Sequence, residues 1–103
     1  MRLIEKLSSM IEDEIDGARC YAKMAVEYKD SKPEFARMLF GMSGDEMEHM
    51  GKLHGAVVEI INEYRETNGE PPAHMQTLYD IMHKKHIEAA AEVKAMQSLY
   101  KEQ

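Results

Sequence analysis

The chain has 103 residues, of which 44% are hydrophobic and 31% are charged, and its formal net charge is −6 at pH 7. This length predicts a single domain, residues 1–103, with a modest core that an oligomer would enlarge. The negative charge argues against nucleic acid as a partner, because phosphates require clusters of Lys and Arg. Cys20 is the only cysteine, which excludes an internal disulfide and a rubredoxin-type iron centre.

The hydropathy of the chain gives no sign of a membrane protein. No apolar run approaches the ~20 residues that span a bilayer, and the first seven residues, MRLIEKL, lack the apolar segment of a signal peptide. We therefore expect no membrane association and a cytoplasmic location.

Two short segments contain residues that break helices. In the first, Ser31 can cap a helix and Pro33 fits the first turn of the helix that follows. In the second, residues 68–72 read NGEPP, which ends one helix and allows another to begin. We predict an all-α fold of three long helices, over residues 2–30, 33–67 and 73–102. The short first link makes the first two helices antiparallel neighbours.

An apolar stripe runs along the first predicted helix and is interrupted at Glu14. A charged side chain within a core stripe is costly unless something compensates it. The apolar positions of the stripe are Leu7, Ile11, Ala18, Tyr21, Ala25 and Tyr28.

The second predicted helix repeats this pattern, and Glu46 and His49 fill the gap in its stripe. When the two helices are placed antiparallel, Glu14, Glu46 and His49 fall at the same height. A lone core Glu often pairs with Lys or His, and a lone His is usually only hydrogen-bonded. Three interruptions at one level instead indicate a ligand cluster. The apolar positions of this second stripe are Phe35, Leu39, Met42, Leu53, Ala56 and Ile60.

The types of residue in this cluster suit particular metals. Two carboxylates and one imidazole, without a thiolate, suit borderline-hard ions such as Fe(II), Mn(II) and Zn(II). The Glu-x-x-His spacing of Glu46 and His49 places both ligands on one helical face, a turn apart. Di-iron bundles use a lone Glu on one helix and Glu-x-x-His on its neighbour, and they use this unit twice.

These motifs, Glu14-x3-Ala18-x2-Tyr21-x3-Ala25 and Asp45-Glu46-x2-His49-x3-Leu53, lie within residues 5–60. On them the chain resembles the ferritin-like superfamily, in particular rubrerythrins, bacterioferritins and encapsulated ferritins. The resemblance implies that Glu14 is a terminal ligand, Glu46 a bridging carboxylate and His49 a terminal nitrogen ligand. It also implies that Tyr21 lies near the metal and belongs with these three residues in the catalytic centre.

The chain departs from a complete ferritin-like bundle, which has a fourth helix and a second Glu-x-x-His. The third predicted helix has an apolar stripe with His86 in line. Glu88 follows Glu46 at about the sequence distance of the family's third carboxylate, but it lies off that stripe. The sequence assigns no role beyond packing to this helix or to its polar residues His83, His86, Glu88 and Glu92. We expect His54, His74 and His83 on the surface. The apolar positions of the stripe are Met75, Tyr79, Met82, Ala89, Val93, Met96 and Tyr100.

A second copy of the chain could supply the helices and ligands that a single chain lacks. Two chains that pair their first two helices would complete a four-helix di-metal bundle with six ligands, which predicts a homodimer or a larger even-numbered oligomer. Encapsulated ferritins, which use such half-bundles, are the nearest precedent and imply an encapsulin shell as a possible partner. The last four residues, YKEQ, differ from the capsid-targeting peptide that those proteins normally carry.

The function expected from the cluster and the resemblance is that of a ferroxidase, which oxidises Fe(II) with O2 or peroxide in iron storage or detoxification. Two alternatives stay open. One is a rubrerythrin-like peroxidase that draws on an external electron donor, and the other is a non-catalytic, metal-binding helical assembly module.

Overall fold

The computed structural model describes residues 2–102, which form three long helices and, over this part of the chain, no strand. The helices are α1 (Arg2–Tyr28), α2 (Pro33–Asn68) and α3 (Ala73–Lys101). The prediction of an all-α fold is confirmed, and each predicted helix end lies within two residues of the observed one.

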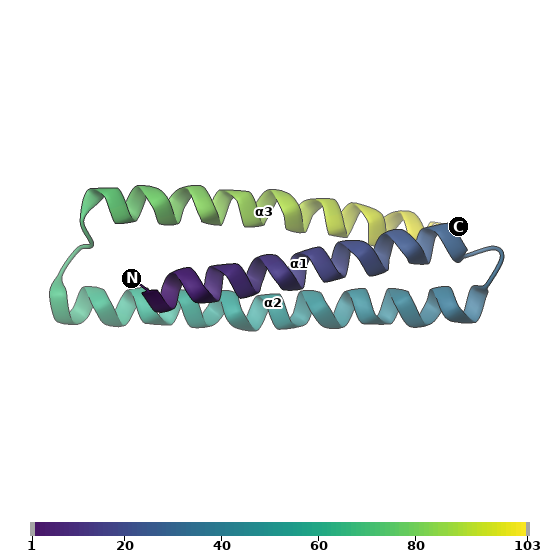
Figure 1. Cartoon of the computed structure of the whole chain (residues 1–103), viewed down its shortest axis with the longest axis horizontal. Helices are drawn as coiled ribbons and strands as arrows, with labels where there is room; N and C mark the ends of the chain where they lie inside the picture. Colours follow the sequence, from purple (N-terminus) through teal and green to yellow (C-terminus); the bar gives the residue numbers. More distant parts are fainter. Residues whose placement is uncertain (1, 103) are drawn as a thin grey trace.

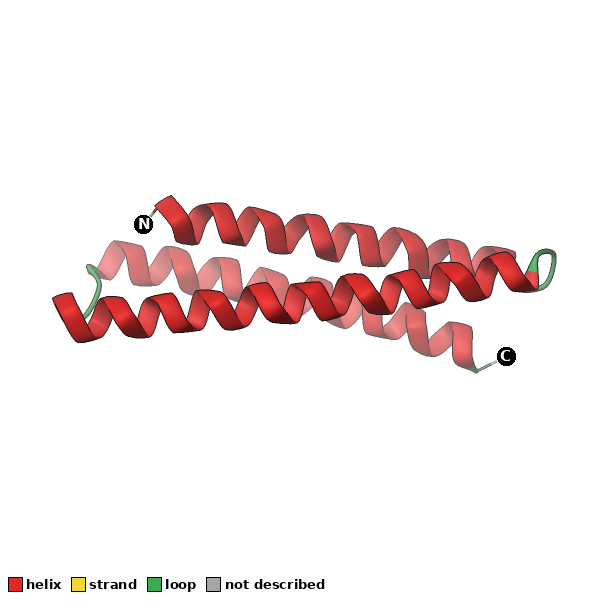
Figure 2. Ribbon diagram, turned by 90° about the horizontal axis from the view of Figure 1, so that it is seen from below, coloured by secondary structure: helices red, strands yellow, loops and turns green. Residues whose placement is uncertain are grey.

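The three helices form an elongated rod of 55 × 18 × 17 Å. Figure 1 shows α1 and α3 running in one direction and α2 in the other, so helices that follow one another are antiparallel. Helix α1 packs against both of the others, whereas α2 and α3 touch at few points. Figure 2 shows α3 behind the pair formed by α1 and α2. The α1–α2 pair is therefore the main packing unit, and α3 is held to it chiefly through α1.

The two connections follow from local backbone chemistry. Pro33 occupies the first turn of α2 as predicted, but the residue that precedes the helix is Lys32, not Ser31, and it makes no side-chain cap. At the other end of α2, Gly69 has φ 76° and donates its backbone N–H to the Arg65 carbonyl oxygen. Glycine adopts this left-handed conformation without steric cost, which allows the chain to turn into α3.

The core of α1 lies slightly to one side of the predicted stripe. Ile15 is almost completely buried and Glu14 is only half-buried, so the expectation that Glu14 interrupts the centre of the stripe is wrong. On α2, Leu39 is buried as predicted, but Phe35 is 38% exposed. The buried positions of α1 recur at steps of three and four, as in helices that pack nearly parallel to a partner. They are Ile4, Ser8, Ile11, Ile15, Ala18, Ala22 and Ala25.

Small residues and one buried hydroxyl group hold the three helices together in the half of the rod nearer the α1–α2 turn. Ala18, Ala22 and Ala36 are fully buried there, and such short side chains allow helix backbones to approach closely. The buried Ser43 hydroxyl donates to the Ala18 carbonyl oxygen at 2.7 Å and accepts from Gln97 of α3 at 3.0 Å. This hydroxyl therefore links all three helices.

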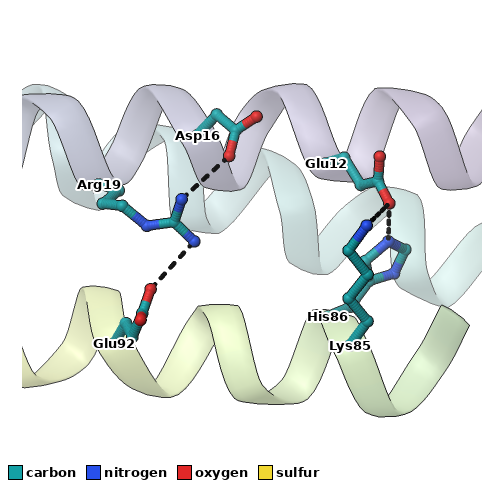
Figure 3. A network of polar contacts seen from close by, with 6 residues as sticks. All are labelled: Glu12, Asp16, Arg19, Lys85, His86 and Glu92. Atoms are coloured by element: carbon teal, nitrogen blue, oxygen red, sulfur yellow. Dashed lines mark hydrogen bonds and ion pairs between the residues drawn. The ribbon is translucent and has the colours of Figure 1, made fainter. Parts of the chain in front are cut away.

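Ion pairs fasten α3 to α1 (Figure 3). Arg19 bridges Asp16 and Glu92, and a Glu12 carboxylate oxygen faces both the Lys85 ammonium and the His86 ring. These contacts give Glu92 and His86 of the third helix a structural role. Burial lowers the pKa of His86, with Glu12 partly opposing this effect. The neutral imidazole is therefore the form that the fold favours.

At the end of the rod away from the α1–α2 turn, a cavity of about 290 Å³ separates the helices. Its walls are mainly apolar and include Ile4, Ile61, Leu78 and Tyr79. Within residues 2–102, no helix combines the length and apolar character needed to cross a bilayer.

Candidate metal centre

The three predicted ligands converge midway along the α1–α2 pair. Nδ1 of His49 lies 3.4 Å from Oε2 of Glu14 and 3.7 Å from Oε1 of Glu46. Two donors that each bind an ion at about 2.1 Å are about 3–4 Å apart, so these separations fit shared ligation of one ion. Over the described residues, no other group of three His, Cys, Asp or Glu side chains has ligand atoms this close together.

The elements that place these side chains explain why they meet. Glu46 and His49 are one turn apart on α2 and so share a face, and the antiparallel packing of α1 brings Glu14 to the same height. All three lie at the α1–α2 interface, where Glu14 is the sequence neighbour of the core residue Ile15. The side chains of Glu14 and Glu46 are 26% and 28% exposed, and that of His49 is 53% exposed. The cluster is therefore partly enclosed and opens to the surface at His49.

The electrostatics of the cluster favour a bound cation. Oε2 of Glu14 is buried without a hydrogen-bond partner, and such a group costs about 1–3 kcal/mol. The pKa of Glu46 is raised, first by the hydrogen bond that its protonated form can make with the Glu14 carboxylate, then by desolvation and by the Glu14 charge, while His49 opposes the rise. A cation among the three residues would supply the missing partner and relieve the repulsion between the carboxylates. The residues present thus fit a metal ion.

Gly17 shapes the site and was missed by the sequence analysis. A Cβ atom at this position would lie 3.3 Å from Oε2 of Glu46, so the missing side chain leaves room for that carboxylate. A glycine in a helix interior costs about 1 kcal/mol relative to alanine. The available signal was a lone glycine within a long predicted helix, one turn after Glu14.

We predict that Gly17→Ala weakens metal binding severalfold while it raises the thermal midpoint of the metal-free protein. The added methyl group displaces the Glu46 carboxylate by a few tenths of an ångström, whereas the helix gains propensity. Calorimetric titration with Mn(II), paired with a melting curve of the metal-free variant, measures both effects. As a matched control, Gly44→Ala on α2 has open space around the added Cβ and should leave the affinity unchanged. Equal affinities for Gly17→Ala and wild type would contradict the role given to Gly17.

The other residues considered from the sequence lie outside the cluster. Tyr21 is half-buried on α1, and in the described structure its hydroxyl makes no hydrogen bond to Glu14, Glu46 or His49. Its place near the metal therefore stays a prediction. Glu88 is exposed on α3, and none of the described residues of α3 joins the cluster.

The chemistry open to this site follows from its ligand set. Three protein ligands leave several coordination positions of an Fe(II) or Mn(II) ion open for water, oxidant or further ligands. Carboxylates are hard anionic donors, which favour the higher charge of Fe(III) over Fe(II). A site of this kind can therefore lower the potential at which iron gives up an electron. No protein-family model, curated protein or solved structure matches the chain.

Proposed function

We propose that this protein is a ferritin-like di-iron carboxylate protein that acts as a ferroxidase, with Fe(II) as its substrate. The observation that carries the proposal is the convergence of Glu14, Glu46 and His49 around a buried Glu14 oxygen that has no other partner. In the reaction two Fe(II) ions each lose one electron, and O2 takes up both electrons and two protons to give hydrogen peroxide. The Fe(III) that forms then passes to storage or detoxification.

Each residue has a role that its position supports. Glu14 and His49 reach the cluster from different helices and would hold iron as terminal ligands. Glu46 lies on the same face as His49 and beside Gly17, and it would act as the bridging carboxylate. Because its pKa is raised, Glu46 keeps its proton to a higher pH than an ordinary carboxyl does, and iron binding there would have to displace that proton.

A second copy of the chain would complete the site. One chain supplies three ligands, which is half of the set found in di-iron bundles. The cluster opens to the surface at His49, so the α1–α2 pair of a second copy can approach it there. Two copies about a two-fold axis would contribute six ligands and the four helices of a bundle, with α3 on the outside.

We expect Fe(II), added without oxygen, to produce a dimer or a larger even-numbered assembly that holds two irons per pair of chains. Light scattering coupled to size-exclusion chromatography gives the mass, and metal analysis of the same fractions gives the stoichiometry. Admission of air should then form Fe(III) faster than in buffer alone. A monomer that binds two irons would refute the shared site.

The same preparation separates the two alternative functions. Faster turnover with hydrogen peroxide and an added electron donor than with O2 would identify a peroxidase. Assembly with metal bound and no acceleration of iron oxidation would identify a non-catalytic module.

A further inference from the structure

A pair of histidines joins α2 and α3 away from the carboxylate cluster. Nε2 of His54 and Nδ1 of His83 are 3.3 Å apart in hydrogen-bonding geometry. The ring centroids are 5.0 Å apart, with 24° between the ring planes. Both residues are half-buried, so the expectation of a surface position is wrong for them, whereas His74 is exposed as expected. Two facing imidazole nitrogens from different helices require a proton or a cation between them.

The spacing of these nitrogens suits a metal ion. A tetrahedral zinc with Zn–N bonds of about 2.0–2.1 Å holds two nitrogens about 3.3 Å apart. Without metal, one ring donates its N–H to the lone pair of the other. When that proton moves to the other nitrogen of the same ring, by exchange with solvent, the ring stays neutral and both lone pairs can bind one ion. Ligands for a tetrahedral ion are therefore already at the required separation.

We propose that His54 and His83 form a second cation site, which takes a borderline divalent ion such as Zn(II) and lies apart from the Glu14 cluster. Imidazole nitrogens suit Zn(II) and Cu(II), whereas carboxylates suit harder ions. In the described structure no carboxylate or thiol completes a group of three ligands at this pair. Water fills the remaining positions, and the two sites select different ions by their ligand chemistry.

The position of the pair gives this ion a structural consequence. Helices α2 and α3 touch at few points, and the pair is one of the side-chain contacts between them, with Arg65 to Gln76 nearer the connecting loop. Tyr79 packs with its ring nearly parallel to that of His83, with centroids 5.8 Å apart, which restricts the His83 side chain. An ion bound here links the two helices and holds α3 in place.

The test is a calorimetric titration with Zn(II) on the full chain carrying Glu14→Ala and Glu46→Ala, which removes the first site. This background should bind one zinc per chain. Addition of His83→Gln, or separately of His54→Gln, should weaken that binding at least tenfold. The control is His74→Gln, which alters an exposed histidine of α3 and should leave the affinity unchanged.

Either of two titration results would overturn the proposal. One is a background protein that no longer binds zinc, and the other is an unchanged affinity after His54→Gln or His83→Gln. The two substitutions lie on different helices, so if one variant loses its helical circular dichroism the other decides. A measurement without substitution at the pair is the NMR spectrum of the histidine ring nitrogens in the same background. Zinc should shift those of His54 and His83 and leave His74 unmoved, and equal shifts at all histidines would contradict a specific site.

Discussion

Replacement of Glu46 by alanine should reduce the oxidation of added Fe(II) to the rate seen in buffer alone. Glu46 is the residue with neighbours in every part of the centre, since it lies near His49 and the Glu14 carboxyl and next to Gly17. Its removal takes away one of three ligands and one of two negative charges from each chain. Formation of Fe(III), followed by absorbance after air is admitted, measures the effect.

The matched control is Glu48→Ala, which removes a carboxylate of the same type from an exposed position on the same helix. It should keep the wild-type rate. If Glu46→Ala and wild type oxidise iron equally fast, the chemistry resides elsewhere in the molecule. If Glu48→Ala is also inactive, the loss reflects overall surface charge and not a defined ligand.

The three helices could be predicted from the sequence because residues at or near their ends determine where each helix begins or stops. Pro33 and Gly69 act through the conformation of their own backbone, which no distant contact needs to specify. The residue before α2 could not be predicted in the same way. Ser31 has the side chain of a good cap, but the backbone reaches helical geometry one residue later, after Lys32.

The position of the candidate site along the helices could be predicted from the sequence, but the degree to which its residues are buried could not. Glu14 and the Glu46–His49 pair lie at equal distances from the turn, and antiparallel packing alone brings them together. On α1, the predicted and the buried stripes share Ile11, Ala18 and Ala25. The predicted stripe includes the position of Glu14, whereas the buried stripe includes Ile15 instead. A single helix does not reveal which side is covered, because that depends on where α3 packs.

The remaining features depend on contacts between distant segments. His54 and His83 have no common sequence motif, and they meet only because α3 folds back along α2. The role of Gly17 likewise depends on the nearby carboxylate of Glu46, which belongs to another helix. Sequence periodicity indicates which face of a helix is buried, but it does not identify the residues of other helices that contact this face. The His54–His83 and Gly17–Glu46 contacts can therefore be recognised only in the folded structure.

Metal binding at the carboxylate cluster should raise the thermal midpoint of the protein strongly at neutral pH. An ion that binds only the folded state contributes about 2.7 kcal/mol when its concentration is 100 times its dissociation constant. For a domain of this size, that corresponds to a rise in the midpoint of about 10–20 °C. The measurement is a melting series by circular dichroism with Mn(II), or with Fe(II) under anaerobic conditions, from pH 7 to pH 5.

The pH dependence of the metal-free protein has two opposing parts. The pKa of Glu46 is raised in the folded state above its ordinary value of 4.5, so the folded protein takes up a proton there before the unfolded chain does. This residue therefore adds stability as pH falls and removes it as pH rises through the raised pKa. The pKa of His86 is lowered from 6.5 by burial. Its contribution is present above pH 6.5 and is lost as pH falls, because the unfolded chain protonates first.

Comparison with and without metal at each pH isolates the cluster, because His86 faces Glu12 of the α1–α3 interface and contributes equally to both samples. The metal-bound form loses affinity for its ion as Glu46 takes up a proton, whereas the metal-free form gains from protonation of Glu46. The difference between the two midpoints should therefore be largest at pH 7 and shrink toward pH 5. In Glu46→Ala it should be small at every pH. A midpoint that metal leaves unchanged throughout this range would mean that Glu14, Glu46 and His49 do not bind an ion together, and that the function of the fold lies in assembly.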